Sequence, residues 1–225
     1  VVGEPLSDGA SLREPRRRAF RPLIAQLWRA WLGRLDLEDV EAELVAQLDR
    51  ANELLTPLGV RLTHLDSHRH THALPGIADV VRDVARRRGI AHVRHSFEAG
   101  ATLLGRPVAR LKASALRTAL GAGQPLDDVR FAGIALMASP TFDADVLAVA
   151  SVVQPGATEL MVHPGYDCPD LAVIDSYRAE RENEVRALTA PGLGQALAAR
   201  GVQLSRFGAS STVRAGSGPT RGTPG

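Results

Sequence analysis

Thr63-His64-Leu65-Asp66-Ser67-His68-Arg69-His70-Thr71-His72 holds four of the seven histidines of this 225-residue chain. The histidines and the aspartate occupy the alternate positions 64, 66, 68, 70 and 72. Because successive side chains of an extended strand point to opposite faces, the sequence predicts that these five groups share one face. That face would present several metal-binding or proton-transfer groups together.

The sequence on both sides of this histidine segment (residues 64–72) predicts a buried strand that opens into a loop. The run from Leu54 to Leu65 is largely apolar, and Leu74-Pro75-Gly76 breaks regular structure. We predict the strand at about Val60 to Asp66. An exposed histidine-rich tract can bind metal adventitiously. The interrupting aspartate and the apolar run before it favour a functional metal or acid–base site at the strand end.

A second histidine follows another apolar stretch, Glu159 to His163, and precedes Pro164-Gly165. We predict a strand whose last residue, His163, is held rigidly at the mouth of a pocket. The alternative is a capped structural histidine.

Apolar periodicity and capping residues predict the remaining elements. Asp36 is a candidate N-cap for a helix that Pro57 and Gly59 stop. A helix from Ile77 ends before Gly89, and a strand follows at Ile90 to Arg94. Strand, helix and strand at this spacing predict a right-handed parallel unit. Further helices are predicted at 108–120, 143–153, 175–188 and 193–200, a strand or loop at 131–136, and a final strand at 202–207.

Composition indicates one globular domain, residues 1–208, with a disordered tail at 209–225. The net charge is +2, which does not indicate nucleic-acid binding. Cys168 is the single cysteine, so no intrachain disulfide is possible, and this suits a reducing, cytoplasmic location. No run approaches the roughly 18 apolar residues of a membrane span.

The histidine segment with Pro75 after it, taken together with Glu159-Leu160-Met161-Val162-His163-Pro164-Gly165-Tyr166, resembles the YdjC-like carbohydrate deacetylases. That family includes chitooligosaccharide deacetylases and a branch associated with hopanoid biosynthesis. Tyr177-x-x-x-Arg181-Glu182-x-Glu184 and Gly201-Val202-x-Leu204 resemble the family's last helix and strand. The resemblance covers about residues 1–207.

The resemblance implies a distorted (β/α) barrel that hydrolyses the N-acetyl group of an amino sugar with one divalent metal ion, magnesium or zinc. The family's metal is held by an aspartate and two histidines, and His68 matches one of these histidines. His163 is the expected catalytic group, which protonates the amine leaving group or stabilises the oxyanion. Asp66 is expected to orient a neighbouring histidine. His64, His70 and His72 are expected to support the site or to face the substrate.

Two family motifs are absent from the chain. One is the strand with Asn-Ala-Asp-Asp-Phe-Gly, which supplies a metal-binding and a catalytic aspartate, and the other is Gly-x-His-x-x-Leu, which supplies the second histidine ligand. Gly3-Glu4-Pro5-Leu6 resembles the segment just after that motif. We therefore expect that the N-terminal strands of the barrel are missing and that the chain expresses poorly unless a homodimer covers the gap. The alternative function is a non-catalytic remnant.

Arg94, at the end of the predicted strand 90–94, lies where a barrel places substrate contacts. It is expected to bind sugar hydroxyls, to orient a carboxylate, or to lie on the surface. The arginine-rich segment 13–21 precedes apolar residues at helical spacing that include Trp28 and Trp31. This pattern predicts either a solvated basic turn with a packed helix or a flap whose tryptophan stacks on a sugar ring. Nucleic-acid binding by the arginines is a further alternative, which the near-neutral remainder of the chain argues against.

Overall fold

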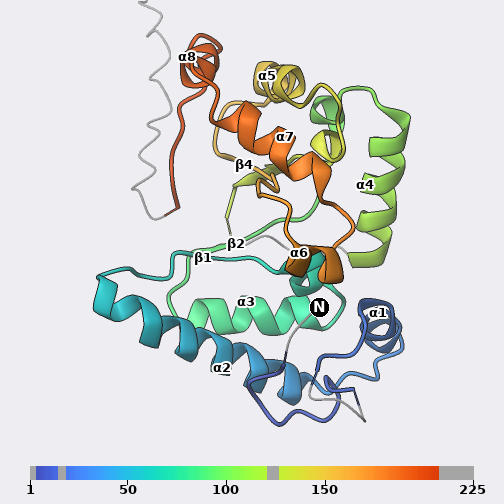
Figure 1. Cartoon of the computed structure of the whole chain (residues 1–225). Coiled ribbons are helices and arrows are strands. Elements are labelled where there is room, and N and C mark those ends of the chain that lie inside the picture. Colours follow the sequence, from blue (N-terminus) through green and yellow to red (C-terminus); the bar gives the residue numbers. More distant parts are fainter. Residues whose placement is uncertain (1–3, 15–18, 121–126, 208–225) are drawn as a thin grey trace, which may run out of the picture.

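The computed structural model describes residues 4–14, 19–120 and 127–207 (Figure 1). The predicted disordered tail, residues 209–225, lies outside these ranges. The helices are α1 Leu23–Trp31, α2 Leu37–Leu55, α3 Ile77–Arg87, α4 Pro107–Leu120, α5 Phe142–Val152, α6 Pro169–Ile174, α7 Ala179–Leu188 and α8 Leu193–Ala198. The strands are β1 His64–Leu65, β2 His92–Val93, β3 Arg130–Ala132 and β4 Thr158–Leu160. Short 3₁₀ helices occupy Thr56–Leu58, His68–Ala73, Gly100–Leu103 and Ile134–Leu136.

Among the described residues, the strands form two separate parallel pairs. β1 pairs with β2, with His64 opposite His92, and β3 pairs with β4, with Phe131 opposite Glu159. Helix α3 connects the first pair and α5 connects the second. The predicted strand–helix–strand unit is therefore confirmed for β1–α3–β2, and the structure adds a second unit of the same kind. The fold is mixed α/β.

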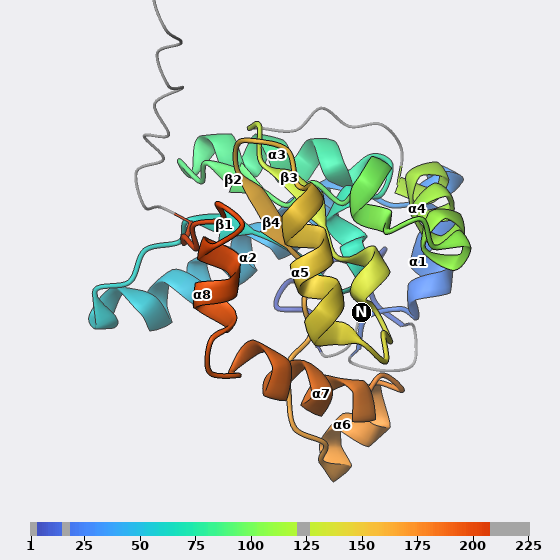
Figure 2. The ribbon, with the colours of Figure 1, turned by 90° about the horizontal axis from the view of Figure 1, so that it is seen from above.

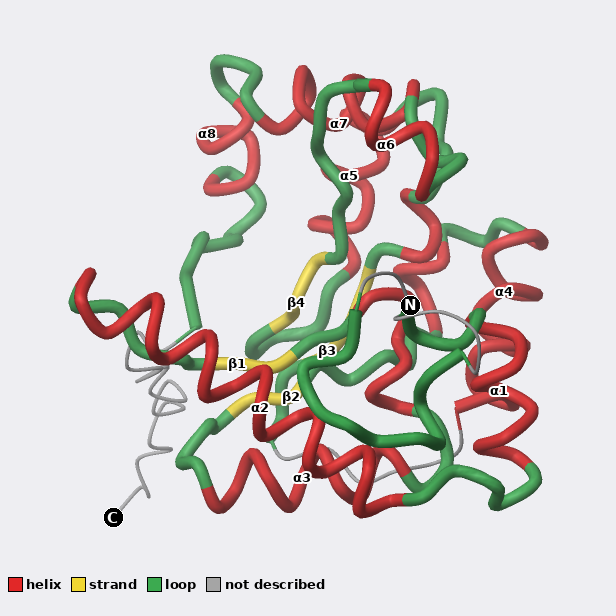
Figure 3. Tube along the Cα trace, turned by 60° about the horizontal axis from the view of Figure 1, so that its bottom comes forward, coloured by secondary structure: helices red, strands yellow, loops and turns green. Residues whose placement is uncertain are grey.

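Helix α3 lies below the β1–β2 pair in Figure 3 and packs against β2, and α2 packs against α3. Asp36 caps α2 as predicted, because its carboxylate accepts the Glu38 N–H at 2.9 Å. Gly89 follows α3 with a φ of +66°, the left-handed conformation expected of a glycine that ends a helix. Leu74, Val84 and Ala85 are almost completely buried in the core beneath these helices.

Helix α5 lies over the β3–β4 pair, and α8 packs against α5 (Figure 2). Ala132, Leu136 and Val149 form the buried centre of this second half. Helix α4 packs on the same strands from another side, with Ala109 and Ala113 against Phe131. The part of the chain that the structure describes has no helix that is long and apolar enough to cross a membrane.

Several predicted strands are shorter than expected or absent. The strand predicted at Val60 to Asp66 is paired only at residues 64–65, because its partner β2 begins at His92. β2 starts late because the Ile90 N–H is still bonded to the Ala85 carbonyl of α3. The strand predicted at Glu159 to His163 ends at Leu160. Residues 202–207 contain no strand, and the Val202 N–H bonds back to Leu197.

The helix predicted at Asp175–Leu188 is wrong in its first part. Asp175 has extended backbone, and its carboxylate accepts the Tyr177 N–H at 3.0 Å, which closes a local turn instead of a helical one. The predicted helix therefore begins only at Ala179, as α7. The separate helix α6 ends at Ile174, before Asp175. The helices predicted near residues 23–32, 108–120, 143–153 and 193–200 are all present, with small differences at their ends.

Helix α1 follows the arginine-rich segment, of which residues 15–18 lie outside the described ranges. Trp28 and Trp31 are both more than half exposed. The Trp31 indole N–H donates to the Ala119 carbonyl at 3.1 Å, so it lies against the end of α4. This contact favours a packed helix over a flap that closes on the histidine segment.

Gly133 provides a test of how tightly the second half is packed. It has a φ of +133°, and an added Cβ would lie 2.5 Å from the Met161 carbonyl oxygen. We expect Gly133→Ala to lower the free energy of unfolding by about 2 kcal/mol or more, because strain and a backbone clash combine. Gly194→Ala is the matched control, since nothing lies within 4 Å of its Cβ position. The control should be neutral or stabilising by up to about 1 kcal/mol in urea denaturation. Equal stabilities of the two variants would contradict this packing.

Candidate functional site

The histidine segment is not extended after Ser67. Residues His68–Ala73 form a 3₁₀ turn in which Arg69 and His70 have φ values of +55° and +57°. Two successive non-glycine residues in the left-handed region are strained, and such strain is concentrated at functional sites. The prediction that five alternate groups share one strand face is therefore wrong. The turn instead directs His70 and His72 inward and leaves His68 exposed.

His72 is buried, and both of its ring nitrogens form hydrogen bonds. Its Nδ1 lies 2.7 Å from the Ser67 hydroxyl, and its Nε2 lies 2.9 Å from the Arg94 carbonyl oxygen. Because a carbonyl only accepts, Nε2 carries the proton and the Ser67 hydroxyl donates to Nδ1. Burial lowers the pKa of His72, which agrees with this neutral form. The Asp66 carboxylate lies 3.7 Å from the same Nδ1, beyond hydrogen-bond distance, and its expected role of orienting a histidine stays a prediction.

His70 lies beside His72 and contacts the other strand pair. Its Nδ1 is 2.9 Å from the hydroxyl of the buried Ser96, and its ring meets Phe131 of β3 edge to face. Burial lowers the pKa of His70 to about 4, with smaller contributions from His72 and Arg94. His70 is therefore an uncharged imidazole at neutral pH.

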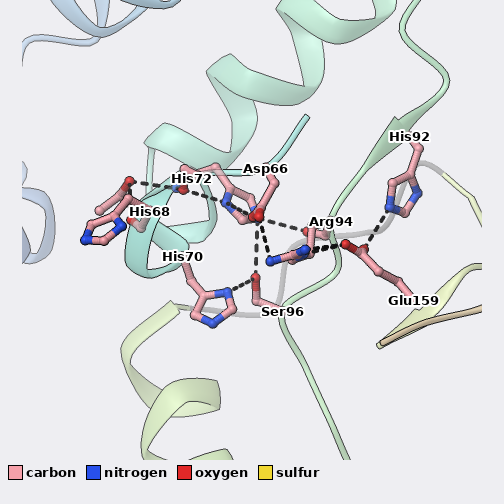
Figure 4. Close-up of polar contacts among 10 residues, drawn as sticks. Asp66, His68, His70, His72, His92, Arg94, Ser96 and Glu159 are labelled. Carbon is pink, nitrogen blue, oxygen red and sulfur yellow. Dashed lines mark hydrogen bonds and ion pairs between the residues drawn. The ribbon is translucent and has the colours of Figure 1, made fainter. Parts of the chain in front are cut away.

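A row of alternating charges connects the two strand pairs (Figure 4). The Arg94 guanidinium contacts the Asp66 carboxylate at 2.5 Å and the Glu159 carboxylate at 2.5 Å. His92 lies between Glu159, at 3.1 Å, and Asp127, at 2.6 Å. Arg94 thus orients two carboxylates, which was one of the three roles expected for it, and it is not a free surface residue. We call Asp66, Arg94, Glu159, His92 and Asp127 the charge row.

The charge row shifts the pKa values of its members in opposite directions. Burial alone would lower the pKa of His92, but hydrogen bonds to Glu159 and Asp127 outweigh it and raise the pKa. Burial alone would raise the pKa of Glu159, but hydrogen bonds from His92 and Arg94 outweigh it and lower the pKa. Both shifts favour the charged forms, so each partner stabilises the other.

His163 lies three residues after β4 and is half-buried. Burial lowers its pKa, and Arg181 and Arg94 lower it further. His163 in turn contributes to the low pKa of His70, so the two histidines are within electrostatic range of each other. Its ring meets the Tyr177 ring edge to face at 5.5 Å. His163 therefore packs against Tyr177 in a partly desolvated position after β4.

His64 lies opposite His92 in the β1–β2 pair but forms no hydrogen bond to the charge row in the described residues. Its side chain is exposed, its Nδ1 contacts the neighbouring Thr63 hydroxyl at 3.0 Å, and its ring stacks on Phe207. His68 is also exposed. Among the described residues, no group of three or more histidine, cysteine, aspartate or glutamate side chains is arranged to hold a metal ion. These residues alone therefore do not provide a complete site for a divalent ion.

A family model described as YdjC-like protein matches residues 6–199. The chain belongs to the YdjC-like family. A human protein named carbohydrate deacetylase is 32% identical over 231 residues, which cover 90% of this chain and 69% of the relative. A chitooligosaccharide deacetylase of Yersinia pestis is 31% identical, over 92% of this chain and 74% of the relative. Carbohydrate deacetylase of Geobacillus stearothermophilus is 32% identical, over 75% of this chain and 58% of the relative.

The fold of this YdjC-like chain also resembles a solved structure. A proposed cellobiose-phosphate cleavage protein from Enterococcus faecalis superposes with a TM-score of 0.61 at 20% identity. The match covers 91% of this chain and 71% of that protein.

Sequence reasoning missed His92, Ser96 and Asp127, and it missed the pairing role of Glu159. Their signal is the presence of charged or polar residues within short apolar strands. His92 lies between Ala91 and Val93, and Glu159 precedes Leu160 and Met161. A charged residue is seldom buried without a partner, so each of these positions indicates an ion pair. The identity of the partner depends on contacts between distant segments.

Arg94 tests whether the charge row stabilises the fold. We expect Arg94→Ala to lower the free energy of unfolding by about 3–5 kcal/mol, because Glu159, which is 8% exposed, loses its guanidinium. Arg87→Ala is the matched control, since its ion pair with Glu41 is largely exposed and worth about 1 kcal/mol or less. Urea denaturation of both variants measures the difference. An equal loss in the two would show that the charge row contributes no more than a surface pair.

The raised pKa of His92 predicts a pH dependence of stability. A group with a raised pKa in the folded state stabilises the protein fully below its unfolded pKa, near 6.5, and loses that contribution as pH rises through the folded pKa. We expect the stability of the wild-type protein to fall above pH 6.5 relative to His92→Gln. The pKa values of the other six histidines are lowered, so their contributions change below pH 6.5 and do not obscure this window. Parallel pH curves for the two proteins above pH 6.5 would refute the assignment.

Proposed function

We propose that this YdjC-like protein is a hydrolase that removes the N-acetyl group from an amino sugar of a glycan. The observation that carries the proposal is the family match over residues 6–199, together with relatives named carbohydrate and chitooligosaccharide deacetylases. The electrostatics adds support, because the charge of His163 contributes to the lowered pKa of His70. A hopanoid-linked amino sugar and a chitooligosaccharide are both candidate substrates.

In this proposal, His163 supplies the proton for the departing nitrogen. Deacetylation adds water to the acetyl carbon and breaks the C–N bond, and the nitrogen needs a proton because an amide anion is a poor leaving group. Because its lowered pKa favours the neutral imidazole at rest, His163 first takes up the proton that the attacking water releases, and the resulting imidazolium then passes this proton to the departing nitrogen. Stabilisation of the tetrahedral oxyanion is the second role proposed for the same side chain.

The other residues of the site position groups in this proposal. Ser67 and the Arg94 carbonyl fix the tautomer of His72. Ser96 fixes the ring of His70, and the buried rings exclude water from one wall of the site. Asp66 acts through His72 and Arg94. We place no chemical role on His64.

A divalent ion, magnesium or zinc, remains a proposal with His68 as one ligand. The described residues do not complete its coordination. The same observation favours the second candidate function, a non-catalytic remnant of the family. We also propose that the two parallel strand pairs belong to a distorted (β/α) barrel, supported by the two parallel strand–helix–strand units and by the family resemblance. The cytoplasmic location and the homodimer stay predictions.

Release of acetate from N-acetylated chitooligosaccharides tests the proposed function. We expect activity with magnesium or zinc present, and a reduction of kcat by about 10²–10⁴-fold in His163→Gln, because the proton donor is lost. His64→Gln is the matched control, since this histidine is exposed and its Nδ1 contacts Thr63, which is not a member of the charge row. It should stay within about threefold of the wild-type rate.

Metal content, measured by elemental analysis after dialysis, separates the two candidate functions. Bound metal that disappears in His68→Ala would support His68 as a ligand. Absence of both acetate release and bound metal in the wild-type chain would favour the non-catalytic remnant. Activity in His163→Gln equal to that of His64→Gln would remove His163 from the mechanism.

A further inference from the structure

Helix α7 holds the backbone of His163 at both of its polar groups. The Glu184 carboxylate accepts the His163 N–H through Oε2, and the Arg181 guanidinium donates to the His163 carbonyl oxygen at 3.2 Å. Glu184 is only 1% exposed, and a carboxylate is rarely buried so fully. The cost of burying this charge is offset only if its hydrogen bonds are well formed.

Tyr177 occupies the other oxygen of this carboxylate. Its hydroxyl donates to Glu184 Oε1 at 2.5 Å and accepts the Ala138 N–H at 3.2 Å. Burial and the hydrogen bond to Glu184 raise the pKa of Tyr177 to about 12, so the hydroxyl keeps its proton and remains a donor. The ring of Tyr177 is also the surface against which the His163 ring packs.

Arg181 ties these contacts into one unit. Its other nitrogens donate to the Tyr177 carbonyl and to the Asp175 carboxylate, both at 2.6 Å, and its guanidinium lies 5.5 Å above the centre of the Tyr177 ring. The hydrogen bonds of Glu184 and Arg181 therefore converge on His163 and on the ring beside it. Helix α7 needs no buried carboxylate merely to pack, because an apolar residue of similar size would do so at lower cost.

We propose that Glu184, Arg181 and Tyr177 are positioning residues that fix the backbone and the ring of His163 in the candidate site. The proposal deepens the proposed function and rests on it for the catalytic consequence. Its structural part, the restraint of His163, is independent of any activity. The three residues act through His163 and do not themselves take part in the chemistry.

Amide hydrogen exchange, read by NMR, tests the restraint directly. Glu184→Gln keeps the size of the side chain, but an NH₂ donor replaces one of the two carboxylate oxygens that accept from His163 and Tyr177, and the negative charge is lost. We expect the His163 amide to exchange at least about tenfold faster in this variant, because its acceptor is weakened or lost. Glu182→Gln is the matched control on the same helix, since Glu182 is exposed and accepts only from the Asp167 N–H. The His163 amide should keep its wild-type exchange rate in the control.

Tyr177→Phe serves as a second variant in case Glu184→Gln does not fold. It keeps the ring beside His163 and removes only the hydroxyl that bonds to Glu184 and Ala138. We expect faster exchange at the Ala138 amide and a changed chemical shift of the His163 amide proton. Unchanged protection of His163 in Glu184→Gln, or unchanged signals of both amides in Tyr177→Phe, would overturn the restraint.

Steady-state kinetics on the acetylated chitooligosaccharide tests the consequence. A misplaced His163 should lower kcat by about 10–100-fold in Glu184→Gln and leave KM within about threefold, because ground-state binding does not use the proton donor. Glu182→Gln should change neither value by more than about twofold. Faster amide exchange with an unchanged kcat would overturn the positioning role. If the wild-type chain releases no acetate, the proposed function fails, and the exchange rates still decide whether the restraint exists.

Discussion

The contact between the Arg94 guanidinium and two carboxylates connects the two halves of this protein. Asp66 directly follows β1, Arg94 directly follows β2, and Glu159 lies in β4. The β2 and β3 strands are not hydrogen-bonded to each other, so side chains have to supply the connection. Arg94 suits this position because its planar guanidinium bonds to several oxygens at once, and it also lies 5.9 Å above the Phe131 ring of β3.

This connection determines the environment of the histidines. The carbonyl oxygen of Arg94 accepts from His72, and Ser96, two residues further along, bonds to His70. The segment from His92 to Ser96, which supplies two members of the charge row, therefore also sets the protonation of the His70 and His72 rings. The result is a region in which the charges of Arg94, Glu159 and His92 are mutually compensated while His70 and His72 remain neutral. Neutral imidazoles beside fixed charges are suited to proton transfer at neutral pH.

The sequence predicted the helices well because each carries its own local signals. Asp36 at the start of α2 and Gly89 after α3 are examples, and both act within one helical turn. Strand lengths were predicted poorly because they depend on where a distant partner begins, as the late start of β2 at His92 shows. The geometry of the histidine segment was wrong for a different reason. Arg69 and His70 adopt positive φ values that their residue types disfavour, and only the surrounding contacts can hold them there.

The charge row illustrates which parts of a site a sequence can reveal. Asp66, His70, His72 and Arg94 were found because they lie in or next to apolar strands that end in polar residues. Their pairing was not predicted, because the partners are far apart in the sequence. Glu159 is 65 positions from Arg94 and 67 positions from His92. His64 was included by its spacing alone, and its side chain is exposed in β1, where its ring stacks on Phe207.

Two different constraints fix the positions of His163 and His70. The strained turn and Ser96 fix His70 on the side of β1 and β2, whereas helix α7 fixes His163 on the side of β4. Neither constraint involves the other histidine, so their relative placement depends on how firmly the two halves are joined. Arg94 and Glu159 contribute to that join, together with the buried Glu98, whose carboxylate accepts the Gly133 and Ile134 N–H groups. A loss at this ion pair would therefore change the spacing of the two histidines even while each remained well held on its own side.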